Sequence, residues 1–282
     1  MANNYYNTPA EVIDANIESG VVKANLPTMK MVFLGMMAGA FIALGGSASN
    51  VAVHNIAQVG LARTLAGAIF PVGLMMIVFV GGELFTGNCL LSMGVCQKRV
   101  TWVQYLRNLT VVYFSNLAGA LIIDFLVFYS GQLDYTSGAL GAYTIKVALA
   151  KVSITPVRGI TSGILCNMLV CVAILMAAAA RDIAGKVRAI FFPIWAFVIG
   201  GFEHCIANMF YIPMGILAAT NPAYVAKAEE LYGITGEQCA SITAVNSLKN
   251  FIPVTIGNII GGAVFVGIIY LVIHKVDYSK KK

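Results

Sequence analysis

Gly81-Gly-Glu-Leu-Phe-Thr-Gly-Asn88 breaks an apolar run that begins at Phe70, and Gly200-Gly-Phe-Glu-His-Cys-Ile-Ala-Asn-Met209 breaks a second run that begins at Phe192. A charged group at membrane depth is costly unless it faces a cavity or a partner. Irregular glycine-rich backbone is tolerated there only where protein or a water-filled path covers it. One such break in each half of the chain is typical of transporters built from inverted repeats. The two stretches therefore predict a membrane protein with two broken helices.

The composition excludes an ordinary soluble domain, since 59% of the residues are hydrophobic and only 11% are charged. A membrane helix needs roughly 20 apolar residues. The sequence offers apolar segments at 30–56, 66–96, 108–130, 157–180, 189–218 and 251–274. We therefore expect an all-α integral membrane protein with six transmembrane helices. The net charge of +6 is explained by basic cytoplasmic loops, so we expect no nucleic-acid partner.

The distribution of basic residues indicates the orientation in the membrane. With both termini inside, only six of the 18 Lys and Arg residues fall in outer segments, namely Arg63, Lys146, Lys151, Arg158, Lys227 and Lys249. Basic residues favour the cytoplasmic side. We therefore expect a multi-pass protein of the inner, or cytoplasmic, cell membrane with both termini in the cytoplasm.

Matching motifs occupy the same places in the two halves of the chain. They are Asn116-Leu-Ala-Gly119 and Asn258-Ile-Ile-Gly261, together with the pairs Gly35/Gly39 and Gly159/Gly163. Small residues at this spacing also serve ordinary helix packing, and that interpretation stays open. Three helices per half would make the repeats inverted, so we predict a 3+3 arrangement.

We divide the chain into an N-terminal cytoplasmic interfacial helix (1–29), a six-helix channel domain (30–274) and a basic cytoplasmic tail (275–282). In the first segment Thr8 is a candidate N-cap, Glu11 completes a capping box and Gly20 can end the helix. This helix could anchor the chain at the interface or gate a pore beside it.

His204 is the one histidine predicted at membrane depth, and it follows Glu203 with Asn208 one turn further on. Because histidine changes charge near neutral pH, it can pass a proton to a weak-acid anion. A hydrogen-bonded core histidine is the structural alternative. Thr86 can donate its hydroxyl to an anion or to His204, or it can cap the half-helix beyond Gly87.

Several other polar residues have both a functional and a structural interpretation. Lys151 is either a solvated loop charge or a group that draws anions into a pore. Asn167 needs a partner, for which we expect Lys151 or His204, and Asp124 is expected to reach the outer interface. We expect Glu203 to orient His204, and Glu83 to hydrogen-bond the backbone of the loop that follows it.

Nothing in the sequence points to a metal, a cofactor or ATP. No second His or Cys stands at ligand spacing from His204, and no phosphate-binding loop occurs. The six cysteines show no C-x-x-C spacing and are interpreted as structural. We expect no cofactor and a transport protein, not an enzyme.

Four motifs together resemble the formate/nitrite transporter family, of the bacterial formate or hydrosulfide channel type. They are residues 82–88, 163–171, 201–209 and 252–262. The resemblance implies an aquaporin-like fold and a homopentamer in the lipid bilayer with one pore in each protomer. It also implies transport of formate, nitrite, hydrosulfide, acetate or lactate, together with protons.

The resemblance also assigns residues. The pore histidine and its acidic neighbour fall on His204 and Glu203, and the threonine of the first break falls on Thr86. The outer lysine falls on Lys151 and the asparagine of the fourth helix on Asn167. The apolar constrictions would include Phe70, Leu74, Leu84, Phe85, Val170 and Phe197.

A mechanistic hypothesis follows from the apolar constrictions. An anion would lose its hydration there at high cost, whereas a neutral acid loses far less. His204 and Thr86 would then supply or relay a proton to the anion. In the competing hypothesis the anion crosses charged, and His204 is only a donor or a pH gate.

Two other classes of protein fit less well. An intramembrane serine protease could use Ser162 and His204, but the usual G-x-S-G is absent. An aquaporin needs two Asn-Pro-Ala motifs, and only 221–223 supplies one. Among the anions we favour formate, with hydrosulfide and nitrite as alternatives.

Overall fold

The computed structural model describes residues 5–275, and within them the regular elements are helices joined by short loops. This confirms the predicted all-α class. The helices are α1 (Pro9–Ala24), α2 (Thr28–Val53), α3 (Val59–Ile69), α4 (Val72–Val80), α5 (Phe85–Asn88), a short 3₁₀ turn (Cys89–Leu91), α6 (Ser92–Cys96), α7 (Trp102–Tyr129), α8 (Ala139–Val152), α9 (Pro156–Ala179), α10 (Ile183–Gly200), α11 (Cys205–Ala218), α12 (Pro222–Tyr232), α13 (Gly236–Ala240), α14 (Ala244–Ile259), a π-helical stretch (Ile260–Ile268) and α15 (Ile269–Lys275).

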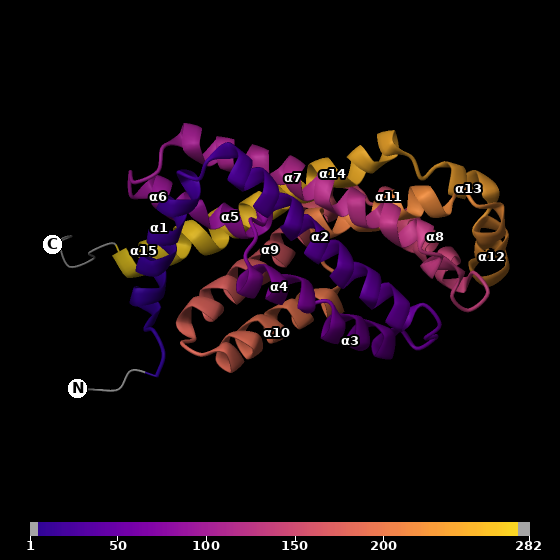
Figure 1. Cartoon of the computed structure of the whole chain (residues 1–282), viewed down its shortest axis with the longest axis horizontal. Coiled ribbons are helices and arrows are strands. Elements are labelled where there is room, and N and C mark those ends of the chain that lie inside the picture. Colours follow the sequence, from indigo (N-terminus) through magenta and orange to yellow (C-terminus); the bar gives the residue numbers. More distant parts are fainter. Residues whose placement is uncertain (1–4, 276–282) are drawn as a thin grey trace.

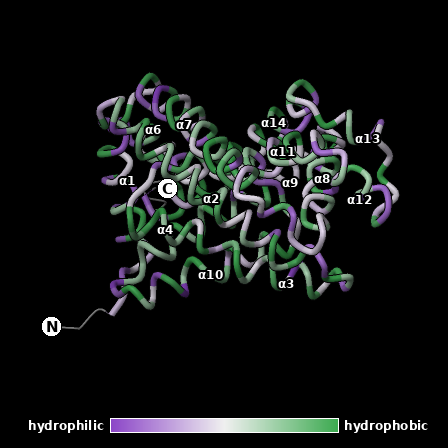
Figure 2. The backbone as a smooth tube through the Cα atoms, turned by 45° about the vertical axis from the view of Figure 1, so that its right-hand side comes forward, coloured by the Kyte–Doolittle hydropathy of each residue, from purple (hydrophilic) through white to green (hydrophobic). Residues whose placement is uncertain are grey.

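Within the described residues, six helical segments are long and apolar enough to cross a membrane, as predicted. They are Thr28–Val53, Val59–Val80, Trp102–Tyr129, Pro156–Ala179, Ile183–Gly200 and Ala244–Lys275. Figure 2 shows hydrophobic colour along the helices of the bundle and hydrophilic stretches mainly near its ends. The second span begins at Val59, earlier than the predicted 66. Helix α8 lies in a connection for which we predicted no helix.

The first and last described helices lie at one end of the bundle, and α12 and α13 lie at the other (Figure 1). An ion pair of 2.5 Å between Lys275 Nζ and Asp14 Oδ1 joins α15 to α1. An even number of membrane crossings explains why these two helices meet. Which end faces the cytoplasm stays a prediction.

Both breaks begin at a glycine with positive φ. Helix α4 ends at Val80 and is followed by Gly81, with φ of +102°; α5 begins four residues after this glycine, at Phe85. Helix α10 ends at Gly200 and is followed by Gly201, with φ of +66°; α11 begins at Cys205. A residue with a Cβ would be strained in this conformation, whereas glycine adopts it readily. The two predicted broken helices are therefore confirmed, each with a Gly-x-Glu corner.

The glycine motifs of the two halves bring helix backbones into contact. A Cβ atom on Gly39 of α2 would lie 1.9 Å from the Asn116 carbonyl oxygen of α7. In the second half, a Cβ on Gly163 of α9 would lie 2.8 Å from the Val254 carbonyl oxygen of α14. Such close approach is how small residues join membrane helices. The motifs thus serve packing, and they do so equivalently in both halves.

Helix α1 has the predicted capping box, with Thr8 and Glu11 exchanging hydrogen bonds. The helix continues past Gly20 to Ala24, so the predicted end is wrong. Gly20 is buried instead, and a Cβ there would touch Leu91 at 3.8 Å. Ile13 and Ile17 are buried in a cluster with side chains of the channel helices. The helix is therefore packed onto the bundle. Of the predicted tail, all but Lys275 lies outside the described residues.

Candidate anion pore

The two chain breaks meet at Thr86 and His204. Thr86 Oγ1 lies 3.0 Å from His204 Nε2, although the two residues are 118 positions apart in the chain. Both residues are buried, with 0% and 3% of their surface exposed. The contact between the Thr86 hydroxyl and His204, which was one of the roles predicted for Thr86, is therefore present in the structure.

The backbone of α11 selects the tautomer of His204. The Ala207 N–H donates to His204 Nδ1 at 2.9 Å, so this nitrogen is an acceptor. A neutral imidazole then carries its proton on Nε2, which donates to Thr86 Oγ1. The Thr86 hydroxyl proton stays available for a further acceptor. The geometry thus presents one free hydroxyl donor where the two breaks meet.

Asn167 holds the backbone of the first break. Its Nδ2 donates to the Thr86 carbonyl oxygen at 3.1 Å and to the Asn258 carbonyl oxygen at 2.6 Å. The Cys171 thiol also donates to the Thr86 carbonyl oxygen, at 3.5 Å. We expected Lys151 or His204 to be the partner of Asn167, and this expectation is wrong. The amide instead satisfies two buried carbonyl groups that would otherwise be costly.

Glu203 is held by a lysine and two asparagines. Its Oε1 accepts from Lys151 Nζ at 2.7 Å, and its Oε2 accepts from Asn208 Nδ2 at 2.7 Å and from Asn250 Nδ2 at 3.1 Å. The expectation that Glu203 orients His204 is therefore wrong, because its oxygens are committed elsewhere. Lys151 is not a free loop charge either, since it lies on α8 with its side chain only 17% exposed.

Glu83 has the corresponding partners in the first half. Its carboxylate lies 3.2 Å from Lys23 Nζ and accepts from Asn88 Nδ2 at 2.6 Å. The expectation that Glu83 bonds the loop backbone is wrong, because Asn116 has this role. Asn116 accepts from the Phe85 N–H at 3.0 Å and donates to the Glu83 carbonyl oxygen at 2.9 Å.

The two halves repeat this network residue by residue. Asn258 accepts from the Cys205 N–H at 2.9 Å and donates to the Glu203 carbonyl oxygen at 2.9 Å, as Asn116 does in the first half. The equivalent pairs are Lys23/Lys151, Glu83/Glu203, Asn88/Asn208, Asn108/Asn250 and Asn116/Asn258. The shared pattern supports the predicted inverted 3+3 repeat.

Sequence reasoning missed four members of this network: Lys23, Asn88, Asn108 and Asn250. A signal was present for Asn88, because an asparagine follows each break glutamate by five residues, at positions 88 and 208. Lys23 gave no such signal, since it lies in an amphipathic helix with other charged residues.

The six predicted constriction residues are all buried, and one of them, Phe197, contacts His204. The rings of Phe70 and Phe197 meet edge to face at 5.6 Å, and Phe197 stacks on His204 at 5.9 Å. Phe85 packs its ring against Tyr113 at 4.9 Å. The remaining three, which are equally buried, are Leu74, Leu84 and Val170. Their role as constrictions stays a prediction.

Two further expectations concern buried polar residues. Asp124 does not reach the interface: it is fully buried, and neither carboxyl oxygen has a partner among the described residues. Ser162 does not contact His204; its hydroxyl accepts from the Glu203 N–H at 3.0 Å. The described residues contain no group of three His, Cys, Asp or Glu side chains that could hold a metal ion.

The sequence profile described as "Formate/nitrite transporter" matches residues 10–272. The chain belongs to this family. It is 37% identical to a probable formate transporter of Methanothermobacter thermautotrophicus, over 94% of this chain and 96% of that protein. It is 36% identical to the formate channel FocA of Escherichia coli, over 94% of each.

Solved structures support the same family relationship. A pentameric formate channel with formate bound has a TM-score of 0.79 at 35% identity, covering 88% of this chain and 97% of that one. An FNT family ion channel has a TM-score of 0.78 at 27% identity, covering 92% and 97%. Members of the formate/nitrite transporter family are channels and transporters, so the alternative of an intramembrane serine protease is rejected. The protein is a multi-pass membrane transport protein and not an enzyme.

Proposed function

We propose that this protein is a channel for small monovalent anions of weak acids, with formate as its main substrate. The observation that carries the proposal is the buried contact between Thr86 and His204, which leaves one hydroxyl donor where the two breaks meet. Supporting relatives are one named a probable formate transporter, at 37% identity, and one named a formate channel, at 36% identity. Nitrite, hydrosulfide, acetate and lactate are the other candidate substrates.

The charges along the proposed path are compatible with the passage of anions. Helices α1 and α8 lie on opposite sides of the breaks (Figure 1). Lys23 of α1 is paired with Glu83 of the first break, and Lys151 of α8 with Glu203 of the second. Because each lysine neutralises a buried glutamate, neither break presents a net negative charge that would repel an anion. Between them, the Phe70 and Phe197 rings beside His204 would make the passage of a hydrated anion costly. The Thr86 hydroxyl would replace part of the lost hydration.

Two versions of the mechanism differ in the role of His204. In the relay version, His204 with Thr86 hands a proton to formate, and the neutral acid crosses the rings. In the second version His204 stays neutral and only orients Thr86, while formate crosses as an anion. The Ala207 hydrogen bond favours the second version, because a proton on Nδ1 would remove its acceptor. Charge movement during transport distinguishes the two.

We further propose that the protein forms a homopentamer in the inner cell membrane with both termini in the cytoplasm. A related structure at 35% identity is described as pentameric. Large hydrophobic side chains such as Trp102, Phe114 and Phe125 are exposed on the flank of the protomer. In a pentamer they would contact lipid or a neighbouring subunit.

Flux measurements in proteoliposomes test the substrate. Formate, nitrite and hydrosulfide would be compared in parallel, with an internal pH dye and a membrane-potential dye reporting the accompanying charge. We expect formate to move fastest, with a membrane potential that builds up when no counter-ion can follow. Alkalinisation matched one to one with formate loss and no potential would establish the relay version. Absence of formate flux would overturn the proposed function.

A further inference from the structure

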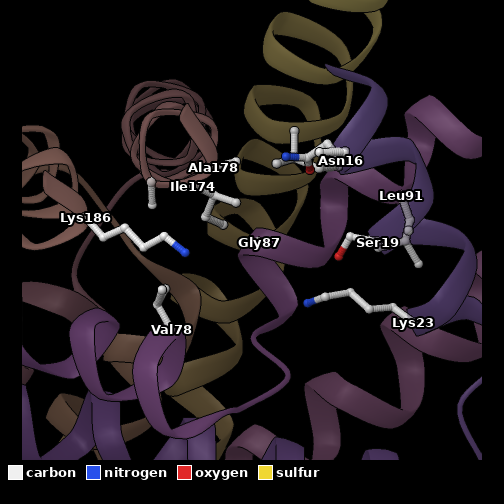
Figure 3. Close-up of a pocket in the computed structure, with 13 residues that line it drawn as sticks. Asn16, Ser19, Lys23, Val78, Gly87, Leu91, Ile174, Ala178 and Lys186 are labelled. Carbon is white, nitrogen blue, oxygen red and sulfur yellow. The ribbon is translucent and has the colours of Figure 1, made fainter. Parts of the chain in front are cut away.

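A cavity of about 230 Å³ lies between α1, α4, the first break, α9 and α10. Its walls include Ser19 and Lys23 of α1, Val78 of α4, Gly87, Ile174 of α9 and Lys186 of α10. In Figure 3 the ammonium groups of Lys23 and Lys186 point into this space from opposite sides. Gly87 directly follows Thr86, so the cavity adjoins the centre of the proposed pore.

The two lysines differ in how their charge is compensated. Lys23 is paired with Glu83 at 3.2 Å and donates to Asn88 Oδ1 at 2.9 Å. Lys186 is half-buried, and none of the carboxylates within residues 5–275 forms an ion pair with it. No acidic residue is among those that line the cavity. The cavity therefore carries an uncompensated positive charge, contributed by Lys186.

We propose that Lys186 is the anion-binding group of a subsite at the α1 end of the pore. The ligand class is a small monovalent carboxylate or a similar oxyanion, which Lys186 would bind while Lys23 stays paired with Glu83. The inference rests on the proposed function for its ligand. The subsite adds an anion-binding residue outside the central contact between Thr86 and His204. It also adds a binding place that the anion reaches before the two breaks.

The size of the cavity determines the kind of binding. A buried water needs roughly 10–15 Å³ of such space, so a cavity of about 230 Å³ holds a small anion together with many of its waters. The anion is therefore not stripped of its hydration here. An uncompensated charge in a low-dielectric recess raises the local anion concentration instead. The subsite collects anions at this end, and desolvation follows at the breaks.

The other broken helix also carries a basic residue near a break. Arg63 is in the first turns of α3, the outer half of the first broken helix, as Lys186 is in the first turn of α10. The Arg63 guanidinium packs over Gly201, where a Cβ would lie 2.3 Å from its Nη1. A basic residue thus lies near each break, Arg63 at Gly201 and Lys186 in the cavity that Gly87 lines.

Membrane vesicles of defined orientation test this inference. Uptake of labelled formate into inside-out vesicles starts at the α1 end, given the predicted topology, and uptake into right-side-out vesicles starts at the other end. We expect Lys186→Gln to raise the half-saturating formate concentration about fivefold in inside-out vesicles. In right-side-out vesicles the change should stay below about twofold. The effect should shrink at high salt, which screens the charge.

Matched variants isolate the charge. Lys186→Arg should behave as the wild type, and so should Lys98→Gln, which removes an exposed lysine outside the cavity. If Lys186→Gln does not fold, Lys186→Cys in a Cys96→Ser background replaces it, because Cys96 is the exposed cysteine. An aminoethyl methanethiosulfonate reagent would restore a positive charge there and should restore the wild-type value.

A second readout needs no transport. Lysine footprinting of the purified wild-type protein in phosphatidylcholine nanodiscs should show that formate protects Lys186 from an amine reagent and leaves Lys98 reactive. Lack of protection, or an equal change of uptake in both vesicle orientations, would overturn the inference. Protection that requires anionic lipid would assign Lys186 to a lipid headgroup and also overturn it. If wild-type vesicles take up no formate, the proposed function fails, and the footprint alone decides whether Lys186 binds the anion.

Discussion

Glu83 and Glu203 occupy equivalent positions in the two repeats, and each carboxylate is paired with one lysine. The distances are 3.2 Å to Lys23 and 2.7 Å to Lys151. Each glutamate also accepts from the asparagine five residues further along the chain. The two most costly charges in the apolar runs are thus neutralised inside the protein, and they support the two breaks.

Removal of Lys151 should destabilise the fold. Lys151→Met leaves the Glu203 carboxylate buried without a cation, and loss of one partner of a buried pair costs about 3 kcal/mol or more. Lys23→Met should cost less, because the Lys23 side chain is 30% exposed and that of Lys151 only 17%. Thermal unfolding in detergent measures both. Lys151→Met combined with Glu203→Gln should recover most of the loss; an unchanged melting temperature for Lys151→Met alone would contradict the prediction.

Replacement of either repeat asparagine should loosen its break. Asn116→Leu and Asn258→Leu each remove three buried hydrogen bonds. A buried group left without its partner costs about 1–3 kcal/mol, so we expect each variant to lose about 2–4 kcal/mol of unfolding free energy. The two losses should be similar because the networks are equivalent. Asn25→Ala, an exposed site, is the control, and a loss confined to one repeat would argue against the equivalence.

The Thr86 hydroxyl should matter more for transport than for stability. Thr86→Val keeps the shape and removes the donor, so formate flux should fall about tenfold or more, the effect of about 1.4 kcal/mol in a barrier. Thr161→Val is the matched control, because the Thr161 hydroxyl only bonds the backbone of its own helix. Stopped-flow flux with equal protein per vesicle measures both. Equal flux in the two variants would remove Thr86 from the proposed path.

Acid should loosen helix α1. Hydrogen bonding from Arg99 holds the pKa of Glu18 below its ordinary value, and bonds from Thr8 lower the pKa of Glu11 in the capping box. A lowered pKa contributes stability above the ordinary value, near 4.3, and this stability is lost as pH falls through the folded value. Hydrogen exchange of α1 should therefore speed up below about pH 4 relative to the bundle. Glu18→Gln should weaken that pH dependence, and an identical response in this variant would contradict the assignment.

Local sequence determined the spans, the two breaks and the repeat. Hydropathy reports burial in lipid segment by segment, and glycine at positions 81 and 201 allows positive φ whatever surrounds it. The capping box at Thr8 was equally readable, because it depends on residues three apart. Hydropathy did not predict helix α8, because α8 is not one of the apolar segments that span the membrane. Gly20 was wrongly predicted to end α1, because its close packing on Leu91 depends on a contact outside α1.

The sequence by itself also placed Thr86 and His204 at the two breaks, and so located the candidate pore. Only the tertiary structure decided which buried groups pair. Lys151 is 52 residues from Glu203, and Lys23 is further still from Asn88. Because an unpaired charge in an apolar interior is costly, a buried charge must have a partner, but this cost does not identify the partner. The choice depends on how distant helices pack, and that packing also brings Lys186 to the cavity beside the first break.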